Sequence, residues 1–234
     1  MIRLFFAAAL FLSLAPFESV AASFDPPQGI ISKERFPQKE LNFVRTESGR
    51  TYLISSDGRY VFQGELFDVW NGERIDSLEK YRRLSERVDM EYLGIEPSRM
   101  FSLDIGSGEK EAYMFVDPGC SYCQNLLKDA AASEQIRSDF KIKVIPVSLL
   151  SENSLEKNKK IATLADDSEE LALKALLEHS FADLEAADGS FPRLKYNLLV
   201  ATALSIKNVP YLVNPNGFIH IGVPQDMRSF LEKE

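Results

Sequence analysis

The sequence predicts an α/β protein in which a small β-rich front segment precedes a larger domain of alternating strands and helices. Three observations support this prediction: strand-forming residues bounded by turns at the front, an apolar strand that leads into a helix near the middle, and a hairpin pattern near the end. Hydrophobic residues make up 45% of the 234 residues and charged residues 26%, an ordinary globular composition. This composition excludes a disordered chain, a collagen and a coiled-coil rod, and the length allows one large domain or two modest ones.

The charge and the cysteine count exclude several classes of function. The chain has 27 Lys and Arg against 35 Asp and Glu, a net charge of −8, and its pI is about 5.0. Such a chain lacks the basic surface that nucleic acids and anionic lipids require, so we expect neither as a partner. The only cysteines are Cys120 and Cys123, which excludes a four-cysteine zinc site and a disulfide-stapled scaffold. We expect no metal and no cofactor.

The first 22 residues are predicted to be a signal peptide. Arg3 gives a short positive start, and residues 4–15 are almost entirely apolar but fall short of the ~20 residues that a membrane-spanning helix needs. Small residues favour cleavage after Ala22, and cleavage after Ala21 is nearly as good. The alternative is an uncleaved anchor or a buried helix. We expect an exported protein, which in a bacterium means the oxidising periplasm.

Residues 23–76 form the predicted front domain. A lead-in over residues 23–42 is rich in Pro, Lys and Glu, and residues 43–75 carry β-branched and aromatic side chains with turn signals at Asp57-Gly58 and Asn71-Gly72. This strand-forming part is too small to bury a sufficient core alone, and its strands have edges that need cover. We therefore expect the front domain to pair with a second copy in a homodimer.

An amphipathic helix is predicted over Ser77–Leu93. Ser77 is a plausible N-cap, and Gly94 and Pro97 end the pattern. Apolar residues recur at three- and four-residue steps on one face: Leu78, Tyr81, Leu84, Val88 and Tyr92. The helix would make residues 77–96 a linker between two domains; an ordinary surface helix is the alternative.

Residues 97–234 are predicted to form the catalytic domain, because their strands and helices follow one another in an order typical of α/β proteins. The predicted elements are, in order, a strand at Ala112–Val116, a helix at Cys123–Ala132, a strand at Phe140–Leu150, a helical insertion at Asn153–Ala187, a helix at Arg193–Ile206, a hairpin at Tyr211–Ile221 and a helix at Pro224–Lys233.

The candidate site is Cys120-Ser121-Tyr122-Cys123. Cys120 follows a strand and a Pro-Gly turn, which places it near a helix N-terminus, where unpaired N–H groups and the helix dipole favour a thiolate. The thiolate is the nucleophile of thiol–disulfide exchange. Cys123, one turn further on, would be the more buried, resolving thiol, and the spacer residues Ser121 and Tyr122 would influence how strongly the reduced form is stabilised.

Two structural alternatives and one further element bear on this site. A disulfide across so short a loop would contribute little stability, and a half zinc site completed by His179 or His220 shows no identifiable second-shell partners. Val209-Pro210 precedes a strand, a position that proline tolerates, and its peptide bond could be cis.

These residues carry a family resemblance. The segment Phe115–Cys123 (FVDPGCSYC), with Val209-Pro210 and Asn216-Gly217, resembles the thioredoxin superfamily and, more narrowly, the periplasmic disulfide isomerases of the DsbC/DsbG family. The front segment Tyr52–Asp68 resembles that family's N-terminal dimerisation domain. The spacer Ser121-Tyr122 differs from the family's Gly-Tyr, Val209 replaces a threonine, and no cysteines remain for an extra structural disulfide.

The resemblance implies a thioredoxin-like catalytic domain with a helical insertion, a linker helix, and a small N-terminal β-rich (α+β) dimerisation domain. It implies a V-shaped homodimer whose cleft holds misfolded, disulfide-containing exported proteins. Cys120 would attack their wrong disulfides, Val209-Pro210 would form a cis-proline loop facing Cys120, and an inner-membrane electron donor of the DsbD type would keep Cys120 reduced. The alternatives are a dithiol oxidase, and a chaperone or assembly factor for a secretion or conjugation system with a secondary redox role.

Overall fold

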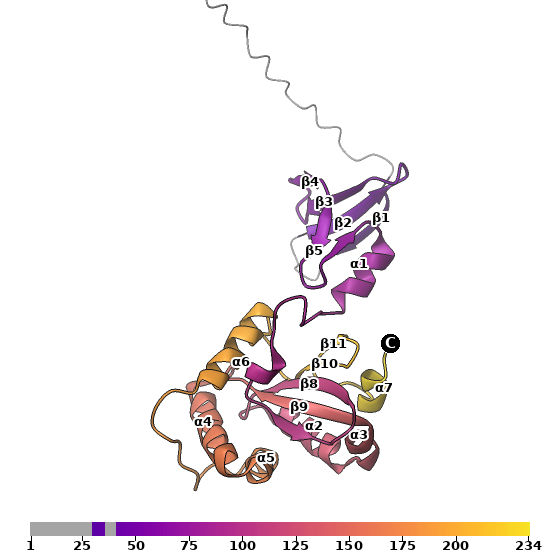
Figure 1. The fold of residues 1–234 in the computed structure, drawn as a ribbon. Coiled ribbons are helices and arrows are strands. Elements are labelled where there is room, and N and C mark those ends of the chain that lie inside the picture. Colours follow the sequence, from indigo (N-terminus) through magenta and orange to yellow (C-terminus); the bar gives the residue numbers. More distant parts are fainter. Residues whose placement is uncertain (1–29, 36–40) are drawn as a thin grey trace, which may run out of the picture. The chain divides into compact units, whose positions relative to one another are not determined.

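The computed structural model describes residues 30–35 and 41–234 (Figure 1). The chain divides into two compact units, Met1–Phe62 and Gln63–Glu234. The predicted signal peptide, residues 1–22, lies outside the described residues. Within the described ranges, no helix has the length and apolar character needed to cross a bilayer.

The first unit is a four-stranded sheet in the order β1-β2-β3-β4, with antiparallel β1–β2 and β2–β3 pairs. The predicted Asp57-Gly58 turn is confirmed, with Gly58 at φ +74°. Three residues, Phe43, Val44 and Tyr52, are its buried apolar side chains among those described. The strands are β1 (Ile30–Arg35), β2 (Leu41–Thr46), β3 (Thr51–Ser55) and β4 (Val61–Gln63).

The second unit begins with a short hairpin and a helix. Strands β5 (Leu66–Asp68) and β6 (Glu73–Ile75) pair antiparallel. The predicted Asn71-Gly72 turn joins them, and the Asp68 carboxylate accepts hydrogen bonds from two backbone N–H groups in it. Helix α1 (Leu78–Ser85) follows, and the Ser77 hydroxyl caps it as predicted.

The predicted helix over Ser77–Leu93, and with it a linker helix over residues 77–96, is wrong in its second half. Helix α1 ends at Ser85, and the chain continues through turns. Two long-range backbone hydrogen bonds explain the early end: Val88 N donates to Gly217 O at 2.9 Å, and Ile219 N donates to Glu86 O at 2.8 Å. These partners replace helical ones. Gly217 is required there because a Cβ would lie 2.5 Å from the Val88 carbonyl oxygen.

The main sheet has five strands in the order β11-β10-β8-β9-β7. Strands β8 and β9 are parallel and are joined through helices α2 (Ser121–Ala132) and α3 (Glu134–Asp139), and the other neighbours are antiparallel. This is the thioredoxin-like α/β arrangement that the resemblance predicted. The strands are β7 (Leu103–Ile105), β8 (Lys110–Val116), β9 (Phe140–Pro146), β10 (Tyr211–Val213) and β11 (Ile219–Ile221).

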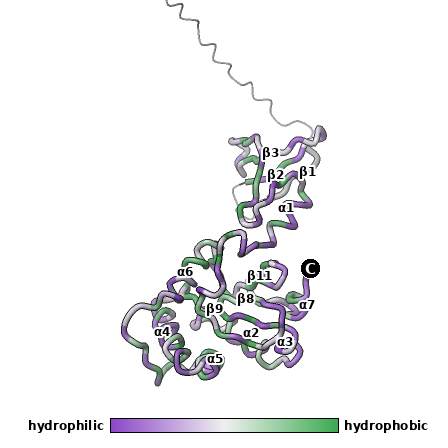
Figure 2. The backbone as a smooth tube through the Cα atoms, in the orientation of Figure 1, coloured by the Kyte–Doolittle hydropathy of each residue, from purple (hydrophilic) through white to green (hydrophobic). Residues whose placement is uncertain are grey.

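Helices cover both faces of this sheet. One face packs on α2 (Ser121–Ala132), α3 (Glu134–Asp139), α4 (Glu152–Asp167), α5 (Glu169–Glu178) and α7 (Met227–Leu231). The other packs on most of α6 (Pro192–Ala203) and on the segment that follows α1, while Leu194 near the start of α6 joins the first core. Successive side chains of strand β8 point to opposite faces of the sheet, so Met114 and Val116 join the first core and Phe115 joins the second. Figure 2 shows α4 and α5 in alternating purple and green, as expected for helices with one apolar side.

The predicted helical insertion between β9 and α6 is confirmed as two helices. Ser168 ends α4 and caps α5 through its hydroxyl, which accepts from Leu171 N at 3.3 Å. The insertion stops being helical at His179, which adopts a left-handed conformation at φ +57°, rather than continuing to Ala187. Residues 180–191 then run without helix to α6.

Candidate active site

Cys120 lies where the buried strand β8 passes into helix α2. Cys120 is the N-cap of α2 and has an extended backbone, and its Sγ accepts a hydrogen bond from Cys123 N at 3.2 Å. Cys120 N donates to Asp117 O at 2.9 Å and closes the intervening turn. The predicted position of Cys120 at a helix N-terminus is therefore confirmed, and the helix dipole points its positive end at this sulfur.

The two thiols differ in burial. Both are free cysteines; Cys120 is 6% exposed and Cys123 is 1% exposed. Burial raises the pKa of Cys123 far above its ordinary value, and the hydrogen bond with Cys120 raises it further. Cys123 is therefore a neutral thiol near pH 7 in this arrangement.

The predicted proline loop faces Cys120. The Val209–Pro210 bond is cis, and the Cys120 thiol donates to Val209 O at 3.6 Å. The sheet explains this contact. Phe115 near the end of β8 pairs with Tyr211 at the start of β10, so the turn that follows β8 and the loop that precedes β10 lie at the same edge of the sheet. Pro210 O also accepts from Gly222 N at 2.8 Å, which holds the loop to the end of the hairpin.

The spacer residues and one neighbouring loop present side chains to solvent at this edge. Ser121 is exposed and Tyr122 is 69% exposed. Leu150, whose backbone N–H belongs to the loop after β9, is 54% exposed. The surface around Cys120 therefore offers large apolar groups, although the thiol itself is mostly covered.

Asp117 is a site residue whose role was missed in the sequence analysis. Asp117 is 1% exposed, and its carboxylate accepts four hydrogen bonds. The donors are Gly119 N at 2.7 Å, Ser154 Oγ at 2.6 Å, Leu149 N at 2.8 Å and Leu150 N at 3.0 Å. The sequence feature that could have indicated this role is the position of Asp117 at the end of a strand predicted to be buried, because a buried charge needs hydrogen-bond partners.

The two histidines lie apart from the thiols. His179 contacts Gln124 and Lys157, and His220 lies on β11 with its ring centroid 5.6 Å from that of Phe230. Over the described ranges, no group of three or more His, Cys, Asp or Glu side chains is placed to hold a metal ion.

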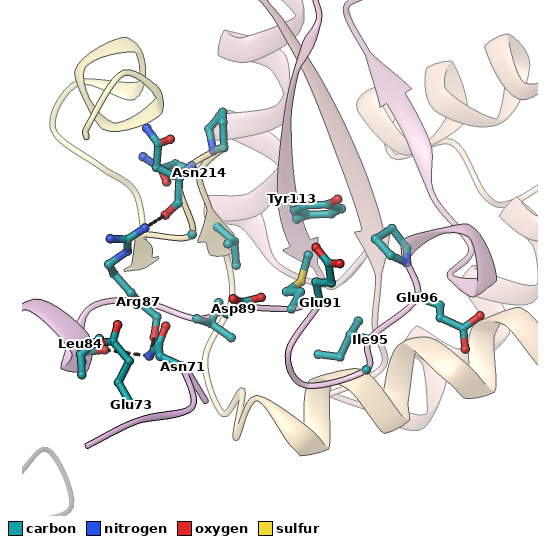
Figure 3. Close-up of a pocket in the computed structure, with 18 of the residues that line it drawn as sticks. Asn71, Glu73, Leu84, Arg87, Asp89, Glu91, Ile95, Glu96, Tyr113 and Asn214 are labelled. Atoms are coloured by element: carbon teal, nitrogen blue, oxygen red, sulfur yellow. Dashed lines mark hydrogen bonds between the residues drawn. The ribbon is translucent and has the colours of Figure 1, made fainter. Parts of the chain in front are cut away.

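A separate cavity of about 890 Å³ lies on the opposite face of the main sheet (Figure 3). Residues 84–98 form one wall and the turn after β10 forms the other, where the Arg87 guanidinium donates to Asn216 O at 2.6 Å. Tyr113 lines it, and burial, followed by the charge of Glu111, raises the pKa of Tyr113 to about 12. The cavity does not include either cysteine.

Comparisons with known proteins give matches among solved structures. No protein-family model matches the chain, and no curated protein matches it in sequence. A disulfide interchange protein from Neisseria gonorrhoeae is 17% identical, with 56% of this chain and 96% of that chain covered and a TM-score of 0.45. DsbG from Helicobacter pylori is 15% identical, with 79% of this chain and 92% of that chain covered and a TM-score of 0.40. ScsC from Proteus mirabilis in a transitional conformation is 18% identical, with 65% of this chain and 82% of that chain covered and a TM-score of 0.48. At such identities the likeness concerns the fold.

Proposed function

We propose that the chain is a periplasmic thiol–disulfide oxidoreductase that isomerises or reduces incorrect disulfides in exported proteins. One observation carries the proposal: the Cys120 sulfur caps helix α2, accepts the Cys123 N–H, and lies 3.6 Å from the carbonyl oxygen of the cis Val209–Pro210 loop. Helix N–H groups stabilise a thiolate at this position, and the thiolate is the attacking species in disulfide exchange. Cys120 is thus the proposed nucleophile and Cys123 the proposed resolving thiol.

The proposed reaction conserves electrons at every step. The Cys120 thiolate attacks one sulfur of a client disulfide, a Cys120–client disulfide forms, and the other client sulfur leaves as a thiolate. In isomerisation, a second client thiolate attacks the mixed disulfide and regenerates the Cys120 thiolate. In reduction, Cys123 attacks Cys120 Sγ, which releases the client as a thiol and leaves a Cys120–Cys123 disulfide. An inner-membrane electron donor of the DsbD type would then reduce this disulfide.

The burial of Cys123 favours isomerisation over reduction. A neutral thiol is a poor nucleophile, and Cys123 is 1% exposed with a raised pKa. In the proposed mechanism, burial of Cys123 slows its attack on the mixed disulfide, which leaves time for a client thiol to attack first. The exposed apolar side chains of Tyr122 and Leu150 suit the unfolded segments of such clients.

Refolding of a scrambled multi-disulfide protein tests the proposed function. The reduced protein should recover native disulfides in a catalytic, substoichiometric manner, because the Cys120 thiolate starts each exchange. The oxidised protein should be inactive until a thiol is added. If instead the oxidised form rapidly introduces disulfides into a reduced client and is the resting form in the cell, the dithiol oxidase alternative is the better account.

The first unit is the proposed homodimer interface, within the predicted front domain of residues 23–76. Its described buried apolar side chains are few, while Tyr60, just before strand β4, is 54% exposed and Phe62, on β4, is 57% exposed. Pairing with a second copy would cover these rings and the edge of the sheet.

Light scattering tests this pairing. The mature protein should be a dimer at micromolar concentration, and Phe62→Glu should shift it to a monomer because a charge would be buried at the interface. The monomer should keep dithiol reductase activity and lose most isomerase activity. Leu171→Glu, at a site that is 53% exposed on α5, is the matched control and should remain dimeric. A monomeric unmodified protein would refute the homodimer.

A further inference from the structure

A cationic pocket lies on the helical insertion, along α4 and at the end of α5. It measures about 300 Å³, and we call it the lysine pocket. It belongs wholly to the second unit and is formed by α4 and the end of α5. Its lining residues are Asn153, Glu156, Lys157, Lys160, His179, Phe181 and Ala182.

The lysines of this pocket are not neutralised by the protein. Lys157 Nζ lies 3.3 Å from His179 Nε2 and 5.3 Å from the centre of the Phe181 ring, and Lys160 Nζ donates to Phe181 O at 3.2 Å. Among the described residues, neither ammonium group has a carboxylate within 4.0 Å, whereas Lys159 on the same helix pairs with Glu156 at 3.7 Å. Glu156, the acidic residue of the lining, pairs with Lys159, so Lys157 and Lys160 leave the pocket with a local positive charge in a chain of net charge −8.

The positive charges near the lysine pocket also affect the pKa of His179. Burial lowers the pKa of His179, and the charges of Lys157 and Lys128 lower it further. Lys157 lies on α4 and Lys128 on α2, so charges from two helices act on His179. An anion bound in the lysine pocket would offset the effect of the lysine charges and raise the pKa of His179, because a negative charge favours the imidazolium.

Hydrogen bonds link residues of the lysine pocket, or their neighbours, to residues before and after Cys120 in the chain. The Gln124 amide bonds with the Nδ1 of His179, and Gln124 follows Cys120 by four helical residues, a rise of ~6 Å. On the other side, Ser154, next to Asn153, donates to Asp117 Oδ1 at 2.6 Å. These links connect the lysine pocket to residues a few positions before and after Cys120. Because each extended residue of a client spans ~3.3 Å, the proposal below needs only a few client residues between the exchanged cysteine and the bound carboxylate.

We propose that the lysine pocket binds an Asp or Glu carboxylate of the client polypeptide while the client's cysteine is exchanged at Cys120. The proposal rests on the proposed function for its client, and it adds a selectivity: disulfides flanked by acidic residues should be exchanged faster than those flanked by amides. Two partly exposed lysine contacts give an expected preference of roughly three- to tenfold.

Binding can be tested without disulfide chemistry. A cysteine-free peptide with Asp and Glu, and its Asn and Gln counterpart, are added to the full mature protein while the His179 ring is followed by NMR. The acidic peptide should shift the His179 signals and raise the pKa of His179, and the amide peptide should not. Lys157→Gln with Lys160→Gln should remove this response, Lys157→Arg with Lys160→Arg should keep it, and Lys174→Gln, a surface lysine of α5, should leave it unchanged. No response to the acidic peptide in the unmodified protein would refute the lysine pocket as a carboxylate site.

A second measurement uses exchange rates. Two disulfide peptides that differ only in Asp and Glu against Asn and Gln are compared with the reduced protein. The acidic peptide should react faster by the stated factor, and the preference should vanish in the Gln double variant and persist in the Arg double variant. Equal rates in the unmodified protein overturn the proposed selectivity. Absence of exchange with both peptides refutes the proposed function instead, and the NMR response then still decides whether the pocket binds carboxylates.

Discussion

Replacing Cys120 with serine is expected to reduce disulfide isomerisation to the uncatalysed background. The hydroxyl cannot form the mixed disulfide that starts every turnover, and no other thiol among the described residues is placed to replace it, since Cys123 is 1% exposed. Cys123→Ser should behave differently, because it leaves the attacking sulfur and its hydrogen bond from residue 123 N in place. Refolding of a scrambled client with reduced protein measures both variants.

The serine variants also separate the mechanisms. Cys123→Ser should retain isomerisation, lose net reduction, and accumulate a client-linked species on non-reducing gels. Cys120→Ser should show no such species. If Cys120→Ser retained full function, the redox pair would be secondary and the chaperone or assembly-factor alternative would account for the protein better.

Asp117→Asn is expected to destabilise the reduced protein by about 3–5 kcal/mol. Four donors converge on the two carboxylate oxygens: Gly119 N, Leu149 N, Leu150 N and Ser154 Oγ. An asparagine offers one acceptor oxygen, and its NH₂ group would face donors on the other side. At least one buried N–H would lose its partner, and the negative charge that attracts all four donors would be gone.

Thermal unfolding measures this effect. For a protein of this size each kcal/mol shifts Tm by ~2–4 °C, so the variant should unfold at least ~6 °C lower. Asp129→Asn, an exposed position on α2, should change stability by less than ~0.5 kcal/mol. Exchange activity should also fall in Asp117→Asn at temperatures where it is folded, because the carboxylate joins the loop that carries Cys120 to the loop after β9. A Tm within 2 °C of the unmodified protein would show that the network is not required.

Local signals were enough to predict much of the catalytic domain. The strand before the cysteines, the hairpin of β10 and β11, and the two turns of the front segment follow from apolar runs and turn residues that lie next to one another in the chain. The position of Cys120 follows from the same kind of signal, since a strand, a Pro-Gly turn and a helix-forming run leave few choices for the residue between them. The cis Val209–Pro210 bond was predicted from its place before a strand together with the family resemblance.

Only the tertiary structure decided the features that join distant parts of the chain. The amphipathic pattern after Ser77 continues to Tyr92, yet the helix ends at Ser85 because Val88 bonds to Gly217, a partner more than a hundred residues away. Asp117 acquires its four donors from three separate segments. The lysine pocket is formed by residues of α4 and by residues at and just after the end of α5. Periodicity and turn chemistry act over a few residues. The hydrogen bonds and charges that decide these features exist only once the sheet brings the segments together.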